Sequence, residues 1–235
     1  MNLSKENRTL LNSAYTFENY IIADSNKFLN EVILSVINFS GETHKPLFIY
    51  GSTGVGKTHL MQAITHRITK NNPALEIFYT TCEQFINHMV RSFQNSSEQD
   101  FVDFYQNLDI LLIDDIHFMK GKESTQEEFF VVLNNLYAAK KQIIISGDRP
   151  PEQIFNVGKE FSDIFQEGLV AEVKSPDYKD RLKFLSRKSE EIGLKTSDCI
   201  LEGIACSVRS GFRGLEGTLN KTKFYSSLKE TTNYK

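Results

Sequence analysis

The stretch YGSTGVGKTHL, from Tyr50 to Leu60, decides the fold. Within it, Gly51 to Thr58 satisfies the pattern G-x-x-x-x-G-K-[ST] in full. An apolar run, KPLFIYG, precedes the pattern and predicts a buried strand. Apolar residues at helical spacing follow it and predict a helix from Thr58 to Lys70. A strand, a glycine-rich loop and a helix in this order predict a phosphate-binding loop.

Each residue type of this loop suits a phosphate. Glycines let backbone N–H groups turn inward, and the N-terminus of the following helix adds a partial positive charge. The lysine would reach the terminal phosphates, and the threonine hydroxyl would ligate Mg²⁺. The loop residues predicted to bind phosphate are Gly51, Ser52, Thr53, Gly54, Val55, Gly56, Lys57 and Thr58.

The second half of the predicted site is ILLIDDI, which contains two adjacent carboxylates. An aspartate at the carboxyl end of a buried parallel strand points into the crevice where ligands bind. We expect Asp114 to hold Mg²⁺, directly or through water, and Asp115 to orient or deprotonate an attacking water. Seen alone, the pair also fits a solvated turn, but the complete loop upstream favours a site for a nucleoside triphosphate with Mg²⁺.

Three further strands are predicted by EIFYTT, KQIIISGD and the weaker GLVAEV. A capping-box pattern from Thr125 to Glu128 predicts the start of a helix that runs to about Tyr137. Strands with unbroken apolar character that alternate with helices indicate a mostly parallel sheet covered on both faces.

Beyond Pro176 the pattern is helical only, over Tyr178 to Ile192, Cys199 to Val208 and Phe212 to Leu228. We therefore predict an α/β nucleotide-binding domain over residues 1–175 and a three-helix domain over 176–235. A polar helical insert occupies about 83–106, which is longer than a simple crossover requires.

The composition is that of an ordinary globular protein of 235 residues with a net charge of −3, so bulk charge does not draw it to nucleic acid. Its three cysteines form no CxxC pattern, as expected of thiols in a reducing compartment. The polar opening stretch has no signal-peptide pattern, and no apolar run is long enough to span a membrane. These features predict a cytoplasmic protein. His59 and His117 belong to no zinc-binding pattern.

Five stretches, PLFIYGSTGVGKTHLMQAI, LLIDDIHF, KESTQEEFF, QIIISGDRPP and FRGLEGTLNK, together resemble the AAA+ module of the bacterial chromosomal replication initiator DnaA family. The resemblance covers about Tyr15 to Ser226. It implies a P-loop AAA+ fold, in which a three-layer parallel α/β sheet is followed by a C-terminal small helical lid, with ATP and Mg²⁺ as cofactors. The opening YTFENYIIADSNKFL is similar to the family's segment that closes over the adenine.

The resemblance also implies roles for single residues. Asp114 and Asp115 would form the Walker B pair, and Asp148 falls at the sensor I position, which feels the γ-phosphate. Arg213 matches sensor II, an arginine of the lid that reaches the phosphates; a salt bridge on the lid surface is the alternative. The insert corresponds to a helical pair shared by the initiators and their helicase-loader relatives.

Two departures from the family pattern change the expected mechanism. Ile164 stands where the family carries an arginine finger, and no arginine occurs from Pro150 to Asp180. Because arginine fingers contribute on the order of 10³ or more to the rate, we expect a weak ATPase at most and no ATP-dependent self-assembly. The chain ends at Lys235 without the family's duplex-reading helix-turn-helix, so we expect no sequence-specific duplex recognition by this polypeptide alone.

Contact with single-stranded DNA is a further implication of the family. Val90, with Arg91 beside it, matches an apolar channel residue of the insert, and Lys122 matches the first of two basic positions. Ser124 replaces the second basic residue, and an exposed lysine on a solvated loop is an equally good interpretation of Lys122. Strand binding would rest on a basic groove that follows the backbone.

The leading hypothesis is therefore an ATP-binding AAA+ switch of replication initiation or its regulation. It would dock on other replication proteins, either a full-length initiator or the helicase system. The alternative is an accessory or helicase-loader-like protein that grips single-stranded DNA. A third interpretation, a binding scaffold with no nucleotide role, would be favoured if ATP failed to raise the melting temperature.

Overall fold

The structure is a computed structural model that describes residues 11–21, 26–37, 46–121, 123–154, 164–165 and 168–232. The chain divides into two compact units. The sheet unit comprises Met1–Tyr20, Phe28–Gly51 and Lys57–Val173. The lid unit comprises Ile21–Lys27, Ser52–Gly56 and Lys174–Lys235, so it takes in most of the phosphate-binding loop.

The sheet unit is built on a five-stranded parallel sheet with the order β2-β3-β4-β1-β5. The strand β1, which precedes the glycine-rich loop, pairs with β4 on one side and β5 on the other. The strand β3, which ends at the first of the two adjacent carboxylates, Asp114, is separated from β1 by β4 alone. The strands are β1 (Leu47–Tyr50), β2 (Ile77–Thr81), β3 (Ile110–Asp114), β4 (Gln142–Gly147) and β5 (Leu169–Glu172).

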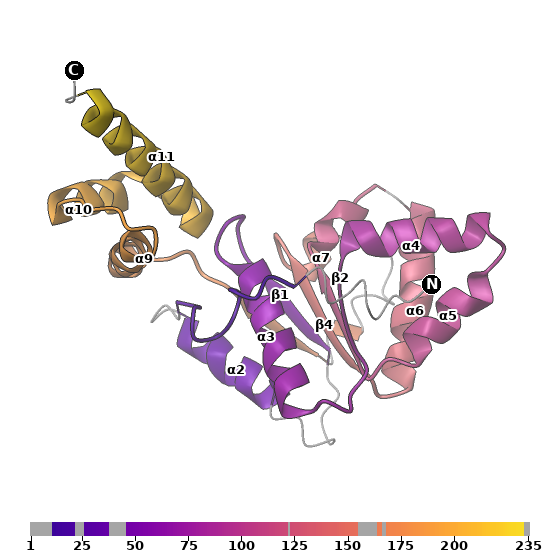
Figure 1. Cartoon of the computed structure of the whole chain (residues 1–235). Helices are drawn as coiled ribbons and strands as arrows, with labels where there is room; N and C mark the ends of the chain where they lie inside the picture. The colour runs from indigo at the N-terminus through magenta and orange to yellow at the C-terminus, as the bar shows by residue number, and fades with distance from the viewer. Residues whose placement is uncertain are drawn as a thin grey trace. The chain divides into compact units, whose positions relative to one another are not determined.

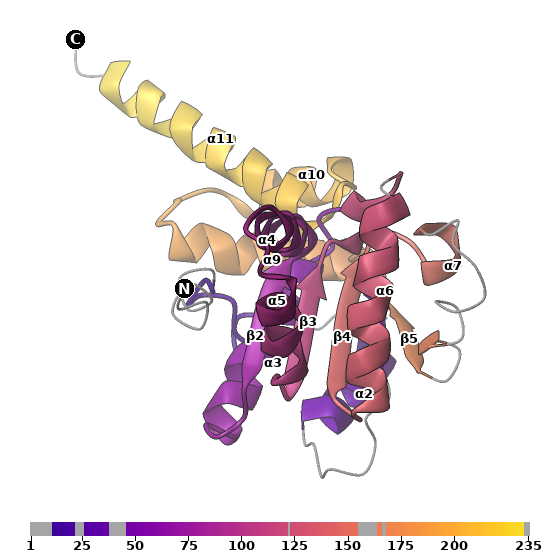
Figure 2. The same cartoon turned by 90° about the vertical axis from the view of Figure 1, so that its right-hand side faces the viewer.

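Helices cover both faces of this sheet, as the unbroken apolar strands require. On one face lie α2 and α3, and on the other lie α4, α5 and α6 (Figures 1 and 2). The predicted three-layer α/β fold is thereby confirmed. The helices of the unit are α2 (Lys27–Ile37), α3 (Lys57–Asn71), α4 (Cys82–Gln94), α5 (Glu98–Gln106), the 3₁₀ turn η2 (Ile116–Met119), α6 (Glu123–Ala138) and α7 (Pro151–Ile154).

The starts of two helices show where sequence patterns mislead. A reciprocal capping box opens α4, with Thr81 and Gln84 bonding to each other's backbone N–H groups. The capping box predicted at Thr125 is wrong, because α6 already begins at Glu123. The side chain of Gln126 donates instead to the carbonyl of Met119, at 2.7 Å, and is buried there.

The lid unit contains the three helices expected from the sequence: α9 (Tyr178–Glu191), α10 (Asp198–Ser207) and α11 (Gly211–Thr232). All three helices contribute leucines to one small hydrophobic core of the lid unit, including Leu185, Leu201, Leu215 and Leu219. Over the described ranges, none of the helices combines the length and the apolar character needed to cross a bilayer.

Candidate functional site

The phosphate-binding loop has the backbone that the motif requires. Gly54 and Gly56 adopt φ angles of 84° and 103°, a region that residues with a Cβ rarely enter. Lys57 opens α3 and is 6% exposed, and its ammonium donates to the carbonyl of Gly51 at 2.7 Å. The loop thus curls around its own lysine at a helix N-terminus, which is the geometry that receives phosphate oxygens.

Part of this loop packs on the start of α11 within the lid unit. The backbone N–H of Phe212 donates to the carbonyl of Gly54 at 2.8 Å. A Cβ built on Gly54 would lie 3.1 Å from the carbonyl oxygen of Ser210 and 3.3 Å from Cβ of Arg213, so the close approach also demands glycine. The sensor II candidate therefore sits in the first turn of a helix that touches the loop.

Asp114 is a buried carboxylate at the carboxyl end of β3, with an exposure of 1%. The hydroxyl of Tyr79 donates to its Oδ2 at 3.0 Å, and the hydroxyl of Ser146 donates to its Oδ1. Neither donor was found by sequence reasoning. The available signal was a polar residue inside an apolar strand, since Ser146 ends IIIS in β4.

Asp115 differs from its neighbour in backbone and exposure. Its φ and ψ of 59° and 47° lie in the left-handed region, and its N–H donates to the Ser146 hydroxyl at 2.9 Å. Its side chain is 36% exposed, with Oδ1 3.8 Å from Nδ1 of His117. The turn thus separates two adjacent carboxylates, one held in the core and one accessible to water.

Asp148 follows β4 and forms a two-pronged ion pair with the next residue. Nε of Arg149 lies 3.0 Å from Oδ1, and Nη2 lies 2.8 Å from Oδ2. The hydrogen bonds from Arg149 hold the pKa of the Asp148 carboxyl below its usual value. Sequence analysis did not single out Arg149, which offsets a negative charge that would otherwise repel a phosphate.

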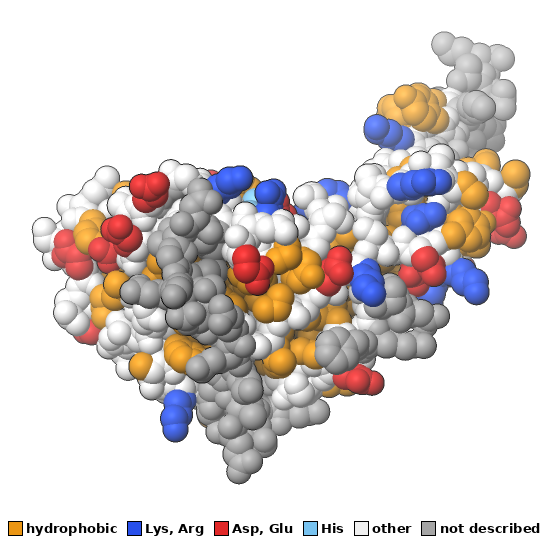
Figure 3. Space-filling view, turned by 180° about the vertical axis from the view of Figure 1, so that it is seen from behind, with side chains coloured by type: hydrophobic (Ala, Val, Ile, Leu, Met, Phe, Trp, Pro, Cys, Tyr) orange, Lys and Arg blue, Asp and Glu red, His pale blue; other side chains and the backbone are white. Residues whose placement is uncertain are grey.

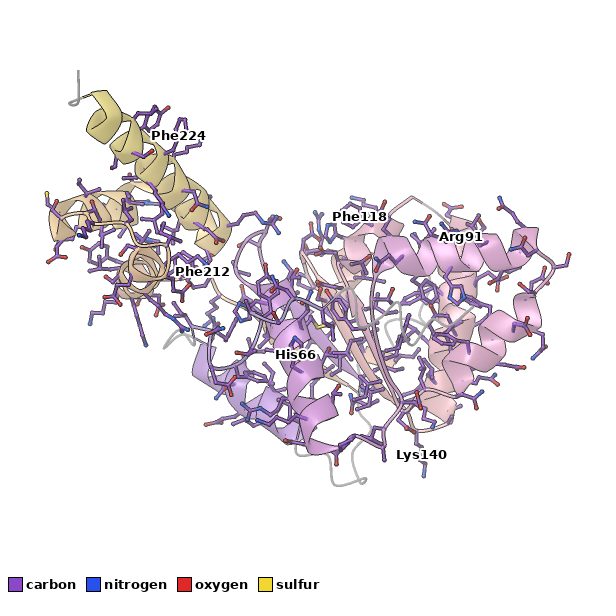
Figure 4. The ribbon with its side chains drawn as sticks, viewed as in Figure 1. His66, Arg91, Phe118, Lys140, Phe212 and Phe224 are labelled. Carbon is purple, nitrogen blue, oxygen red and sulfur yellow. The ribbon has the colours of Figure 1, made fainter. Side chains whose placement is uncertain are left out.

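The segment before α2 is held against α3 by two histidines of that helix. Nε2 of His59 lies 2.9 Å from the carbonyl of Thr16, and its ring stacks on Tyr15 at 4.7 Å. Nε2 of His66, labelled in Figure 4, lies 3.1 Å from the carbonyl of Asn12. His59 therefore holds the start of the segment that the resemblance placed near adenine, and His66 holds the residues just before it.

The donor set fits Mg²⁺ bound together with phosphates. Within the described part of the chain, no group of three or more His, Cys, Asp or Glu residues could hold a metal ion by itself. Mg²⁺ commonly needs only one or two carboxylates plus substrate phosphates and water. The buried oxygens of Asp114 and the hydroxyl of Thr58, next to Lys57 at the helix start, match that requirement.

The candidate DNA contacts lie on α4 and nearby. Val90 is 42% exposed, Arg91 is exposed beside it, and α4 packs against η2, where Phe118 is 53% exposed. In Figure 4, Arg91 and Phe118 lie at the end where the strands finish, opposite Lys140. Lys122 falls outside the described residues. On the face drawn in Figure 3, basic and acidic side chains are interspersed.

At the position where the family carries an arginine finger, this chain has a side chain of the hydrophobic core. Ile164 is 5% exposed and belongs to the main hydrophobic cluster of the sheet unit. Its neighbour Phe165 packs edge-on against Phe48 of β1, with ring centroids 5.2 Å apart. This side chain is therefore turned inward, in addition to carrying no charge.

Comparisons with known proteins agree with this geometry. A family model described as the bacterial DnaA ATPase domain matches residues 11–172. The chromosomal replication initiator protein DnaA of Caldanaerobacter subterraneus subsp. tengcongensis is 42% identical over 218 residues, which are 93% of this chain and 49% of that protein. The chain thus spans about half the length of the curated relatives it matches.

Solved structures give the same family. Domain III of the Thermotoga maritima replication initiation protein DnaA superposes with a TM-score of 0.85 at 36% identity, covering 96% of this chain and 92% of that one. A replication initiator DnaA bound to AMPPCP and single-stranded DNA superposes with a TM-score of 0.81 at 32% identity, covering 95% and 69%.

Proposed function

We propose that this chain, which belongs to the family of bacterial DnaA ATPase domains, binds Mg-ATP as a switch of replication initiation or its regulation. The observation that carries the proposal is the contact between the loop and α11. Gly54 accepts a hydrogen bond from Phe212, next to Arg213, so a change in the phosphates held by the loop would reach the lid helix. Binding of AMPPCP by a relative with the same fold supports the nucleotide assignment.

In this proposal the loop backbone and Lys57 hold the terminal phosphates. Thr58 and Asp114 hold Mg²⁺, which would supply charge stabilisation at the phosphates. Asp115, the exposed member of the pair, positions the attacking water. Asp148, which directly follows β4, and Arg213 in α11 would each sense the phosphates.

Turnover is slow in this proposal, because the residue at the finger position is an inward-facing isoleucine. Nothing at that position stabilises charge on a neighbouring subunit's phosphate. The bound nucleotide then acts as a state marker that favours one lid arrangement, and the partner that responds is another replication protein in the cytoplasm.

A second candidate function is contact with single-stranded DNA. It is favoured by the exposed Val90 and Arg91 on α4 with Phe118 on η2, and by the single-stranded DNA bound to the relative described above. The exposed ring of Phe118 offers a surface on which a base could stack. Equilibrium binding of a labelled oligonucleotide over a range of salt concentrations tests it, and binding that is absent at low salt contradicts it.

The switch is tested by capturing partners on the immobilised chain with ATP, with ADP and without nucleotide. Purified full-length initiator and replicative helicase serve as separate probes, and a chain carrying Lys57→Ala is the matched control. We expect capture of one probe to change about tenfold between ATP and ADP, and not to change in the control. Equal capture of both probes in all states would contradict the switch.

A further inference from the structure

A chain of hydrogen bonds crosses the buried interior of the sheet unit and ends on Asp114. It begins at the backbone N–H of Asn12, which donates to Oε1 of Gln62 at 2.8 Å. Nε2 of Gln62 donates to the hydroxyl of Tyr79 at 3.2 Å. That hydroxyl donates in turn to Oδ2 of Asp114 at 3.0 Å. These hydrogen bonds therefore link the backbone at Asn12 to the Asp114 carboxylate through one side chain of α3 and one of β2.

The other oxygen of the Asp114 carboxylate accepts a hydrogen bond from β4, the strand on the opposite side of β3 from β2. The hydroxyl of Ser146 in β4 donates to Oδ1 of Asp114 and accepts from the N–H of Asp115 at 2.9 Å. Both carboxylate oxygens are therefore fixed, one from each adjacent strand. The same serine ties down the left-handed turn that carries Asp115.

The side chains that form this chain lie among apolar residues. Gln62 is 5% exposed, Tyr79 is 2%, Asp114 is 1% and Ser146 is 0%. A buried carboxylate is costly unless it is hydrogen-bonded, and each unmatched polar group would add its own desolvation penalty. Apolar residues at these positions would build the same sheet at lower cost, so the arrangement calls for a role beyond packing.

The direction of the hydrogen bonds is set by the inventory of donors. The amide of Gln62 uses its oxygen for Asn12, so it turns its NH₂ group toward Tyr79. The tyrosine then has its single proton left for Asp114.

We propose that Tyr79, Ser146 and Gln62 are positioning residues that hold the Asp114 carboxylate at the Mg²⁺ position. Each carboxylate oxygen accepts one of these bonds and keeps a lone pair for the ion or its water. Groups that hydrogen-bond a metal ligand fix its orientation, and their loss commonly weakens metal binding 10- to 100-fold. This role rests on the proposed function, because it presupposes that Mg-ATP binds at this loop.

The test is Tyr79→Phe, compared with Tyr105→Phe as a matched control. Tyr105 is equally buried at 1% exposure, and its hydroxyl lies 3.2 Å from Nδ1 of His88, away from the chain to Asp114. Affinity for ATP is measured first without Mg²⁺, and Mg²⁺ is then titrated into the ATP complex. We expect Tyr79→Phe to weaken Mg²⁺ binding about tenfold or more with unchanged affinity for ATP alone. The control should match the wild type in both affinities.

The outcomes separate the two proposals. A wild type that binds no ATP overturns the proposed function. A wild type that binds Mg-ATP, with equal Mg²⁺ affinity in Tyr79→Phe, overturns the positioning role alone. Reduced Mg²⁺ affinity in both tyrosine variants would also overturn it, because loss of any buried hydroxyl would then have the same effect.

A second variant serves if Tyr79→Phe does not fold. Gln62→Met removes the bond to Tyr79 and leaves the tyrosine in place, so we expect a smaller loss of Mg²⁺ affinity, about threefold. In the same variant, without nucleotide, amide hydrogen exchange at Asn12 should become faster, because its acceptor is gone. Unchanged exchange at Asn12 together with unchanged Mg²⁺ affinity would contradict the proposal that these hydrogen bonds position Asp114.

Discussion

The carboxyl end of the sheet and the outer face of α4 and η2 lie at the same end of the sheet unit, yet they are built in opposite ways. At the first, polar side chains such as Asp114 and Ser146 are buried with their hydrogen bonds made. At the second, apolar side chains such as Val90 and Phe118 are exposed. Fixed buried polar groups suit chemistry on a bound ligand, whereas exposed apolar groups beside Arg91 suit contact with a partner.

This contrast separates the effects of substitutions. A change at the carboxyl end should alter nucleotide or metal binding, often with a loss of stability, because buried partners are left unmatched. A change on the outer face should leave both almost untouched, since surface substitutions usually shift the free energy of unfolding by less than about 0.5 kcal/mol.

The largest expected effect within the first region is on hydrolysis. Asp115→Asn removes the exposed carboxylate that we propose as the group that positions water, and we expect the residual ATPase rate to fall about 100-fold or more. ATP affinity should stay within twofold, because the proposed metal partner is the buried Asp114 and not Asp115. Phosphate release and equilibrium binding measured on one preparation check this, and an equal loss of both would remove Asp115 from a catalytic role.

A second prediction concerns self-assembly. Mg-ATP alone should not drive the chain into filaments, because the inward-facing Ile164 offers no guanidinium to a neighbour. Light scattering at increasing protein concentration, with ADP as the control, measures this. A rise in scattering with ATP and not with ADP would show that another residue supplies the contact.

The smallest effect is expected on the outer face. Arg91→Ala should reduce the slope of log affinity against log salt for a single-stranded oligonucleotide by about 0.7, if one phosphate contact is lost. Phe118→Ala tests base stacking in the same assay. Both variants should bind Mg-ATP as the wild type does. A loss of nucleotide affinity in either would contradict the separation of the two regions by function.

The sequence predicts some of these features better than others. The strands, the loop and the three lid helices follow from apolar periodicity and from glycine placement, which are local properties. The partners of Asp114 are Tyr79 and Ser146, which lie in two different strands and meet it only through the strand order. The predicted helix start at Thr125 is wrong, because a capping pattern also occurs inside helices and α6 begins at Glu123.

The exposed fraction of a single apolar side chain also cannot be predicted from the local sequence pattern. Ile164 and Phe118 are both apolar residues in short segments, and only the packing decides that one is 5% and the other 53% exposed. The pairing of Arg149 with Asp148 forms in the bend after β4, and the sequence does not show that the two neighbouring side chains turn toward each other.

The most direct test of the central claim, that this loop binds Mg-ATP, is thermal unfolding of the wild type and of Lys57→Ala with and without Mg-ATP. At about 100-fold its Kd, the ligand should stabilise the wild type by about 2.7 kcal/mol. Lys57→Ala removes the ammonium that the loop curls around, so its melting temperature should not respond to ATP. An ATP-dependent shift of equal size in both proteins would contradict the assignment of the loop.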